Sequence, residues 1–348
     1  MARSRSGGKR GRLATALEHT AHDPKLRAVA ASAVAASGAI TTGKLVRARV
    51  EQRKRRERSR RYRLEPGETP IEGIGRVARG QLDLAIELLG GGGDDGEAIH
   101  EARKTLKRVR AALRLSRDHL GTYRYRHENV ILRDAGRELS GARDARVLLE
   151  TLDGLAEHNP ETLSAPARTR LRTALSATAE AAGATDDASP SAVINALADA
   201  RVRVATWPLP EDGGPEAFAP GLERIYRRGR RALRTAEKEA TVDSLHELRK
   251  RAKDLWHAAQ LLRPAAPKRM KKLARRAHQL SDLLGDDHDL AVLLDRARAQ
   301  PELLDEGELA ALSALVQRRQ DRLRRDALAL AARLYRRKPR KLAAIVAG

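Results

Sequence analysis

Rows of Lys and Arg led by a histidine are the residues of this chain whose types and spacing most clearly indicate chemistry. The first row occurs in HEARKTLKRVRAALRL, residues 100–115, whose apolar residues recur at the spacing of one helix face. Guanidinium and ammonium groups arranged along a helix bind oxyanions, whereas the alternative is the solvated basic side of an ordinary amphipathic helix. The candidate residues of this row are His100, Arg103, Lys104, Lys107, Arg108, Arg110 and Arg114.

A second segment repeats this row. From residue 246 the chain reads HELRKRAKDLWHAAQLL, in which His, Arg, Lys and Lys recur at a constant offset of 146 from the first row. The candidates here are His246, Arg249, Lys250 and Lys253. Asp95 and Thr241 each stand five residues before the leading histidine, where a helix N-cap is expected. Asp254 replaces the Arg108 of the first copy, which makes the second row thinner.

Two further blocks repeat almost in step and indicate an internal duplication. LSGARDARVLLETL at residues 139–152 aligns with LGDDHDLAVLLDRA at residues 284–297, at an offset of 145. The alignment sets Arg143 against His288, and both become candidate site residues. A period of about 145 residues is too long for a solenoid of short repeats, so we expect two pseudo-symmetric halves with one row each.

Together these segments resemble the conserved histidine α-helical domain (CHAD) family. The resemblance covers about residues 64–340 and rests on the two histidine-led patterns, the Arg143-Asp144 turn and Leu284-Gly285-x-x-His288-Asp289. It implies an all-α fold of two helical bundles around a basic central groove. It also implies that the chain binds inorganic polyphosphate without turnover. From that binding we expect an association with polyphosphate granules.

The hydrophobic spacing itself predicts an all-α chain, because almost no segment alternates with a period of two. A basic accessory region at residues 1–63, partly disordered or helical, precedes a CHAD-like domain at 64–345. Its halves span about 64–206 and 215–345, and Trp207–Pro215 is the linker. We expect helices at about 71–89, 100–120, 123–139, 142–157, 163–182, 192–206, 216–239, 242–263, 267–284, 287–299 and 307–336. Further candidate cations on these helices are Arg133, Arg137, Arg275 and Arg276.

The charge of the chain indicates a polyanionic partner. The net charge is +23, and residues 1–63 hold 18 Lys and Arg against 4 Asp and Glu. Cysteine is absent, which excludes disulfides and Cys-based zinc sites and suits a reducing compartment. The uncharged run 28–43 is too weakly apolar for a membrane span, and no secretory signal is evident, so we expect the cytoplasm.

The position of each row near a helix start favours an anion there. The helix macrodipole already places positive charge at this end, and a bound phosphate would relieve it, although Glu101 and Glu247 offer local neutralisation instead. Neighbouring cations depress the pKa of a histidine and a bound phosphate raises it, so His100 and His246 would gain charge on binding. Alternatively, these rings orient their helices by hydrogen bonding to a carboxylate.

Among polyanions, a phosphate polymer fits best. Sequence-independent binders of single-stranded nucleic acid add aromatic stacking platforms, and Trp256 is the one aromatic residue near the rows. We therefore expect noncatalytic polyphosphate binding, with no metal or cofactor. One alternative is a nonspecific nucleic-acid binder that uses the basic residues 1–63. Another is a metal-dependent phosphohydrolase built around Asp286, Asp287, His288 and Asp289.

Overall fold

Helices make up all of the regular structure in the residues that the computed structural model describes, which are 62–91, 96–139, 143–158, 163–184 and 190–347. The all-α prediction is therefore confirmed. The N-cap predicted at Asp95 and the expectations for residues 1–61 lie outside the described residues. None of the described helices is both long and apolar enough to cross a bilayer.

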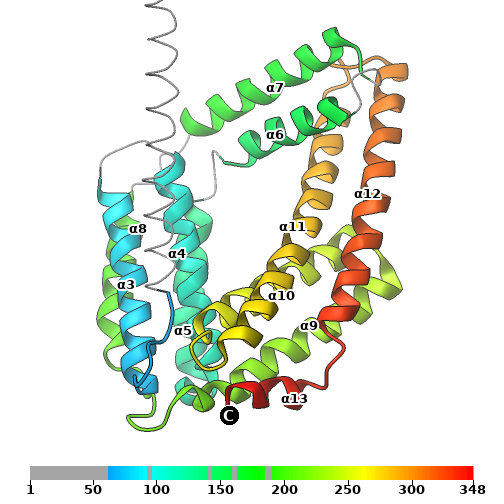
Figure 1. Cartoon of the computed structure of the whole chain (residues 1–348). Helices are drawn as coiled ribbons and strands as arrows, with labels where there is room; N and C mark the ends of the chain where they lie inside the picture. The colour runs from blue at the N-terminus through cyan, green and yellow to red at the C-terminus, as the bar shows by residue number, and fades with distance from the viewer. Residues whose placement is uncertain (1–61, 92–95, 140–142, 159–162, 185–189, 348) are drawn as a thin grey trace, which may run out of the picture. The chain divides into compact units, whose positions relative to one another are not determined.

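The first group of packed helices presents the first row. It consists of α3 (Pro70–Gly90), α4 (Gly96–Leu115), α5 (Arg117–Glu138) and α8 (Pro190–Val204) (Figure 1). Thr69 starts α3 with a capping box, because its hydroxyl accepts a hydrogen bond from the Glu72 amide and the Glu72 carboxylate accepts one from the Thr69 amide. On α4, Ala102, Leu106 and Val109 are buried in the core, which leaves the cations on other sides of the helix.

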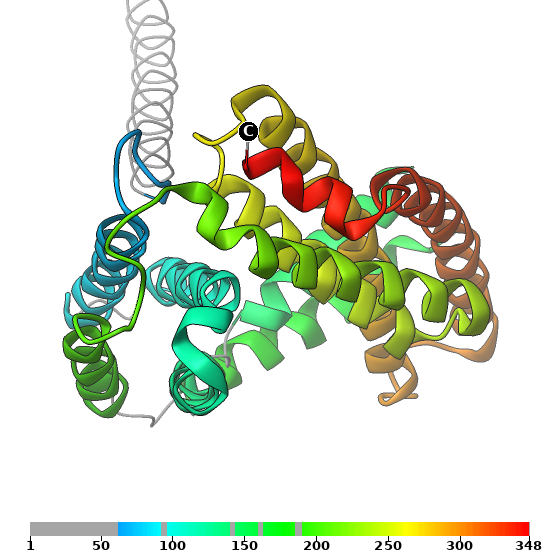
Figure 2. The ribbon, with the colours of Figure 1, turned by 90° about the horizontal axis from the view of Figure 1, so that it is seen from below.

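The second group presents the second row. It consists of α9 (Ala219–Glu239), α10 (Val242–Leu261), α11 (Pro267–Arg298), α12 (Glu306–Leu334) and the short α13 (Pro339–Ala343), with 3₁₀ turns at Pro215–Phe218 and Ala344–Val346. The N-cap predicted at Thr241 is confirmed, because its hydroxyl accepts a hydrogen bond from the Ser244 amide at 3.2 Å. Figure 2 shows α13 lying along α9.

Helices from the first part of the sequence also pack against the second group. A hairpin of α6 (Arg143–His158) and α7 (Ala165–Ala184) lies against α11 and α12 (Figure 1). Leu148 and Leu152 of α6 share a hydrophobic cluster with Leu293 of α11 and Leu312 of α12. The two parts of the sequence are thus packed into one unit of residues 61–348, with a main core that includes α4 and α10 together.

Two predicted helix boundaries differ from the structure. The helix expected to reach residue 120 ends at Leu115, and Gly121 lies within α5, where its φ of 73° produces a kink. The helices expected at 267–284 and 287–299 form the single helix α11, which continues through Gly285. Glycine is a poor helix former, so the sequence indicated a break that tertiary packing overrides.

Candidate anion-binding site

The two predicted rows come together around His257. This histidine of α10 is buried, and burial lowers its pKa well below the ordinary value. Arg108 and Lys107 of α4 and Lys253 of α10 lower that pKa further through their positive charges. Cations from α4 and from α10 are therefore close enough to act on one ring. The part of the first row around Lys107 and Arg108 lies near Lys253 of the second row, on helices that pack against each other.

Tyr62 and Gln81 hold Arg108 in this position. The Arg108 guanidinium lies 5.6 Å from the centre of the Tyr62 ring, and its Nη1 donates a hydrogen bond to Gln81 Oε1 at 3.2 Å. The Tyr62 hydroxyl donates to the Arg108 carbonyl oxygen at 3.2 Å. The Tyr62 ring also meets His257 edge-on, with 6.1 Å between ring centres. Sequence reasoning missed Tyr62 and Gln81, because neither carries a charge nor belongs to a repeated block.

His246 and His288, two candidates from different repeated blocks, contact each other in the structure. Their rings, from α10 and α11, have centres 4.9 Å apart. Burial lowers the pKa of His246 to about 4, and the charges of Lys250, His288, Arg249 and Lys253 contribute to the shift. Nδ1 of each ring is buried and has no hydrogen-bond partner among the described residues. His246 is therefore neutral at pH 7 and surrounded by cations.

Arg249 lies across α11 at Gly285. Its Nε donates a long hydrogen bond of 3.4 Å to the carbonyl oxygen of Ser281. A Cβ atom at Gly285 would stand 2.9 Å from Nη2 of Arg249 and 3.3 Å from its Nε. The missing side chain at Gly285 thus provides the space in which the guanidinium lies. This contact explains why glycine occurs inside α11.

Asp254 connects α4 and α10. Its Oδ1 lies 3.2 Å from Nη1 of Arg114, and its Oδ2 accepts a hydrogen bond from Nη1 of Arg251 at 2.8 Å. Burial lowers the pKa of neighbouring Arg110 to about 10, the charge of Arg114 lowers it further, and Asp254 opposes the shift. Arg110 also donates to Asn129 Oδ1 at 3.1 Å. Asp254 is therefore the counter-charge of an arginine cluster at the junction of the two rows.

Several other predicted cations have local carboxylate partners. Lys104 lies 2.6 Å from Glu101, and Lys250 lies 3.9 Å from Glu247, so the local neutralisation considered from the sequence occurs at these two positions. Arg133 and Arg137 both contact Asp134, at 2.8 Å and 3.5 Å.

Of the last three candidates, two lie outside this cluster of residues, and the side chain of the third is not among those that the structure describes. Arg143 begins α6, and its side chain lies outside what the structure describes. Arg275 is exposed on α11. Arg276, from the same helix, lines a different pocket together with residues of α12 and of the segment before α13.

Asp287 of α11 has a structural partner on α12. Asp287 is buried, and its Oδ1 accepts a hydrogen bond from Nε of Arg324 at 2.7 Å. Burial raises the pKa of Asp286, and the charge of nearby Asp289 adds to the shift. Among the described residues, no group of three or more His, Asp or Glu side chains is arranged to hold a metal ion.

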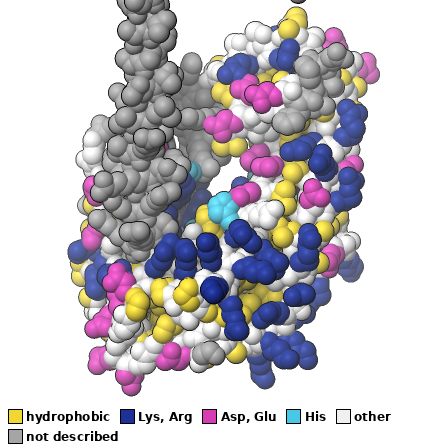
Figure 3. All heavy atoms as spheres, viewed as in Figure 1, with side chains coloured by type: hydrophobic (Ala, Val, Ile, Leu, Met, Phe, Trp, Pro, Cys, Tyr) yellow, Lys and Arg dark blue, Asp and Glu magenta, His cyan; other side chains and the backbone are white. Residues whose placement is uncertain are grey.

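The surface over α10 and α11 is strongly basic. Figure 3 shows a band of Lys and Arg side chains across this face, with a histidine at its edge and a hollow beside it. Trp256 of α10 lies between two histidines, with ring centres 4.6 Å from His257 and 4.0 Å from His278 of α11. The site thus combines cations with buried aromatic and imidazole rings that fix the helices on which the cations stand.

The fold and site define an all-α protein in which two histidine-led cationic helices adjoin. The model of the CHAD domain matches residues 76–298, and the chain belongs to this family. A crystal structure of the CHAD domain from the plant Ricinus communis has the same fold, with a TM-score of 0.55 and 17% sequence identity. The match covers 79% of this chain and 94% of that domain. No curated protein matches the sequence.

Proposed function

We propose that this chain binds inorganic polyphosphate without hydrolysing it, through the surface formed by the two rows. This row surface consists of His100, Arg103, Lys107 and Arg108 of α4 and His246, Arg249, Lys250 and Lys253 of α10. The observation that carries the proposal is that α4 and α10, which bear the two rows, pack together and are joined by the 3.2 Å ion pair of Arg114 with Asp254. A polymer lying there would contact both helices.

The chemistry of the row surface favours a phosphate polymer over a nucleic acid. A polyphosphate chain offers a negative charge at every unit, and arginine forks and lysine ammonium groups contact its oxygens directly. Base stacking would need exposed aromatic rings, yet Tyr62 is buried at 1% exposure and Trp256 is packed between two histidines. The rows therefore supply charge, whereas Tyr62 and Trp256 provide no platform on which a base could stack.

The row surface holds phosphate oxygens but has little means of activating water. Guanidinium groups stay protonated near pH 7 and cannot take up a proton. His246 is neutral at that pH, but its buried Nδ1 contacts neither a carboxylate nor another described group by hydrogen bonding. We propose that its role is to take up a proton when phosphate binds, because an anion nearby stabilises the imidazolium form.

A competition experiment on the full chain tests this proposal. Fluorescently labelled long-chain polyphosphate is bound first, and unlabelled polyphosphate or duplex DNA is added at equal phosphate concentration. We expect polyphosphate to displace the label and DNA to displace it far less. Release of inorganic phosphate, followed with Mg²⁺ or Mn²⁺ present, should not exceed the rate without protein. Equal displacement by DNA would remove the proposed specificity, and phosphate release abolished by Asp289→Ala would indicate a hydrolase.

A further inference from the structure

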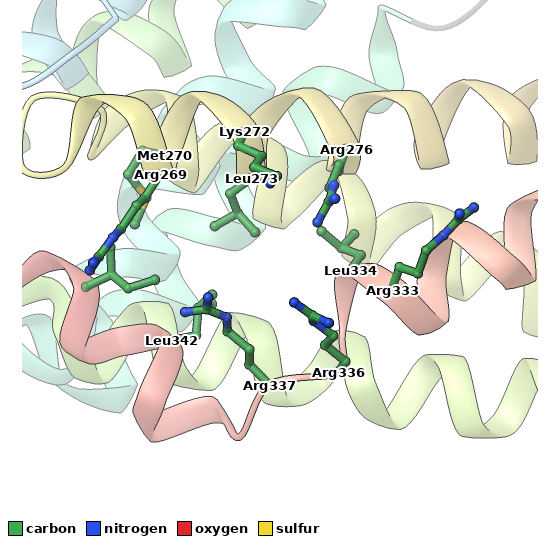
Figure 4. A pocket seen from close by; sticks show the side chains of 11 residues that line it. Arg269, Met270, Lys272, Leu273, Arg276, Arg333, Leu334, Arg336, Arg337 and Leu342 are labelled. Carbon is green, nitrogen blue, oxygen red and sulfur yellow. The ribbon is translucent and has the colours of Figure 1, made fainter.

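A second group of cations gathers on the opposite side of α11. Arg269, Lys272 and Arg276 share one face of that helix, because they follow each other at intervals of three and four residues. Arg333 near the end of α12, together with Arg336 and Arg337 before α13, completes the lining. In Figure 4, Arg276 extends from α11 while Arg336 and Arg337 extend from the opposite side toward the space between them. We call this the α11–α13 pocket.

The pocket has no internal counter-charge. Its lining contains six cations and no Asp or Glu. None of the six has a carboxylate oxygen within 4.0 Å among the described residues. Several arginines elsewhere in the fold do have a carboxylate partner, as Arg251 has in Asp254 and Arg324 in Asp287. Six positive charges around one cavity repel each other, and an anion from solution would relieve that repulsion.

The backbone that carries Arg336 and Arg337 is anchored. The buried hydroxyl of Tyr226 on α9 donates a hydrogen bond to the Leu334 carbonyl oxygen at 2.9 Å and accepts one from the Arg337 amide at 3.2 Å. Leu334 and Leu342, which line the floor, are 5% and 3% exposed and belong to the main core. The cations therefore stand on fixed backbone, so less ordering is needed when an anion binds.

The size of the pocket limits its ligand. Its volume is about 120 Å³, and because it is open to solvent, any part of a ligand beyond a few phosphate groups would lie outside it. A floor of Leu and Ile side chains offers no hydrogen bonds to a sugar or a base. The cations at its rim match the oxygens of linked phosphates, which each carry between roughly one and two negative charges near neutral pH.

Arg276 is specific to the second half of the sequence. At the offsets of 145 and 146 that relate the repeated blocks, it corresponds to Ile131 or Val130. Arg269 and Lys272 do have basic counterparts, which are Arg124 and Arg126. An apolar residue in place of Arg276 cannot bind an anion, so a first-half counterpart of the pocket would lack this cation.

We propose that the α11–α13 pocket is a second anion-binding site, which takes a compact oligophosphate such as inorganic triphosphate. It binds this ligand independently of the row surface and whether or not the row surface binds polyphosphate. Arg276 and Arg336 lie on opposite sides of the space and contact the phosphates from both sides, while Leu334 and Leu342 form the floor.

Calorimetric titration of the full chain with inorganic triphosphate at low salt tests the proposal. We expect a triphosphate site whose affinity is at least about tenfold lower in Arg276→Glu/Arg336→Glu and unchanged in Lys107→Glu/Lys253→Glu, separate from any triphosphate that the row surface binds. Arg276→Gln/Arg336→Gln repeats the test without charge reversal, and circular dichroism checks that each variant is folded. Monophosphate should bind more weakly than triphosphate.

Three outcomes would overturn the proposal. The first is the absence of triphosphate binding by the folded full chain. The second is binding that the row variants remove and the pocket variants leave unchanged. The third is a pocket-dependent affinity for duplex DNA without affinity for triphosphate. Because the row and pocket variants are measured separately, failure of this proposal leaves the test of polyphosphate binding by the row surface intact.

Discussion

Arg114 of α4 and Asp254 of α10 form an ion pair of 3.2 Å between the two helices that carry the rows. Their side chains are only 16% and 12% exposed. Removing one partner of a buried pair leaves the other charge without compensation, which costs more than the pair itself contributes. The pair therefore holds α4 against α10 and fixes the spacing between the rows.

Asp254→Ala should destabilise the fold substantially. The substitution leaves Arg114 partly buried without a carboxylate and Arg251 with Glu247 alone, and we expect the free energy of unfolding to fall by about 3 kcal/mol. Urea denaturation followed by circular dichroism measures this change. The control is Asp153→Ala, which removes the exposed partner of Arg172 and should cost less than about 1 kcal/mol. Equal losses in the two variants would show that the buried pair has no special role.

Gly285→Ala should weaken polyphosphate binding without weakening the fold. The added Cβ would displace Arg249, whereas alanine favours helix by about 1 kcal/mol over glycine. We expect affinity to fall by about fivefold, equivalent to about 1 kcal/mol, with no loss of unfolding free energy. Gly80→Ala on α3 is the matched control, because its Cβ would meet no atom within 4 Å. The prediction is contradicted if both variants bind the polymer equally well.

Polyphosphate affinity should rise as pH falls from 7.5 toward the His246 pKa of about 4. The pKa of His246 is about 4 in the unoccupied protein, because of burial and the charges of Lys250, His288, Arg249 and Lys253. A bound phosphate raises that pKa, so the complex holds the extra proton and binding tightens as pH falls. Affinity measured from pH 7.5 to 5 checks this, with His246→Gln expected to flatten the profile and His127→Gln to leave it unchanged. A flat profile in the parent protein would refute the proposed role of His246.

The lowered pKa of His246 has the opposite effect on folding: the free energy of unfolding decreases as pH falls. The ordinary pKa of histidine, 6.5, exceeds that of folded His246, so the unfolded chain binds more protons between pH 6.5 and about 4. The contribution of His246 to folding is therefore complete above pH 6.5 and is lost as pH falls through this window. Measuring the free energy of unfolding at pH 7 and pH 5 for the parent and for His246→Gln separates the contribution of His246 from that of other groups. Between these two pH values the parent should lose more stability than the variant.

Tyr226→Phe should loosen the α11–α13 pocket. The hydroxyl makes hydrogen bonds on both sides of the turn that carries Arg336 and Arg337, and its removal leaves a buried carbonyl and amide without this partner. We expect a loss of about 1 to 2 kcal/mol in unfolding free energy and weaker triphosphate binding. Polyphosphate binding by the row surface should stay unchanged. Unaltered stability would show that the hydroxyl does not anchor the turn.

Local spacing predicted the helices and the rows well, because both depend on neighbouring residues. The periodicity of α4 and the N-cap Thr241 needed no knowledge of the fold. The continuity of α11 could not be predicted in this way, because glycine disfavours helix and the packing of α11 against α10 and α12 overrides that preference. The sequence showed that Asp254 interrupts the second row of cations. It did not show that Asp254 forms an ion pair with Arg114, which lies 140 residues away in the sequence.

The α11–α13 pocket shows the same limit. Arg276 was a candidate from its charge, but its neighbours Arg336 and Arg337 follow 60 residues later and belong to no repeated block. Their convergence is set by the turn between α12 and α13 and by Tyr226, which are tertiary features. Charge in a sequence therefore identified candidates, and packing decided which of them lie together.

The central claim is that one polymer contacts both rows, and charge reversal in each row tests it most directly. Polyphosphate affinity of the full chain is measured for Lys107→Glu, Lys253→Glu and the double variant, with Lys238→Glu/Arg298→Glu as a control that makes the same charge change at exposed positions. We predict about a tenfold loss for each single variant, a larger loss for the double variant, and a shallower salt dependence in each case. Affinity that stays unchanged in the double variant, or falls equally in the control, would contradict the claim.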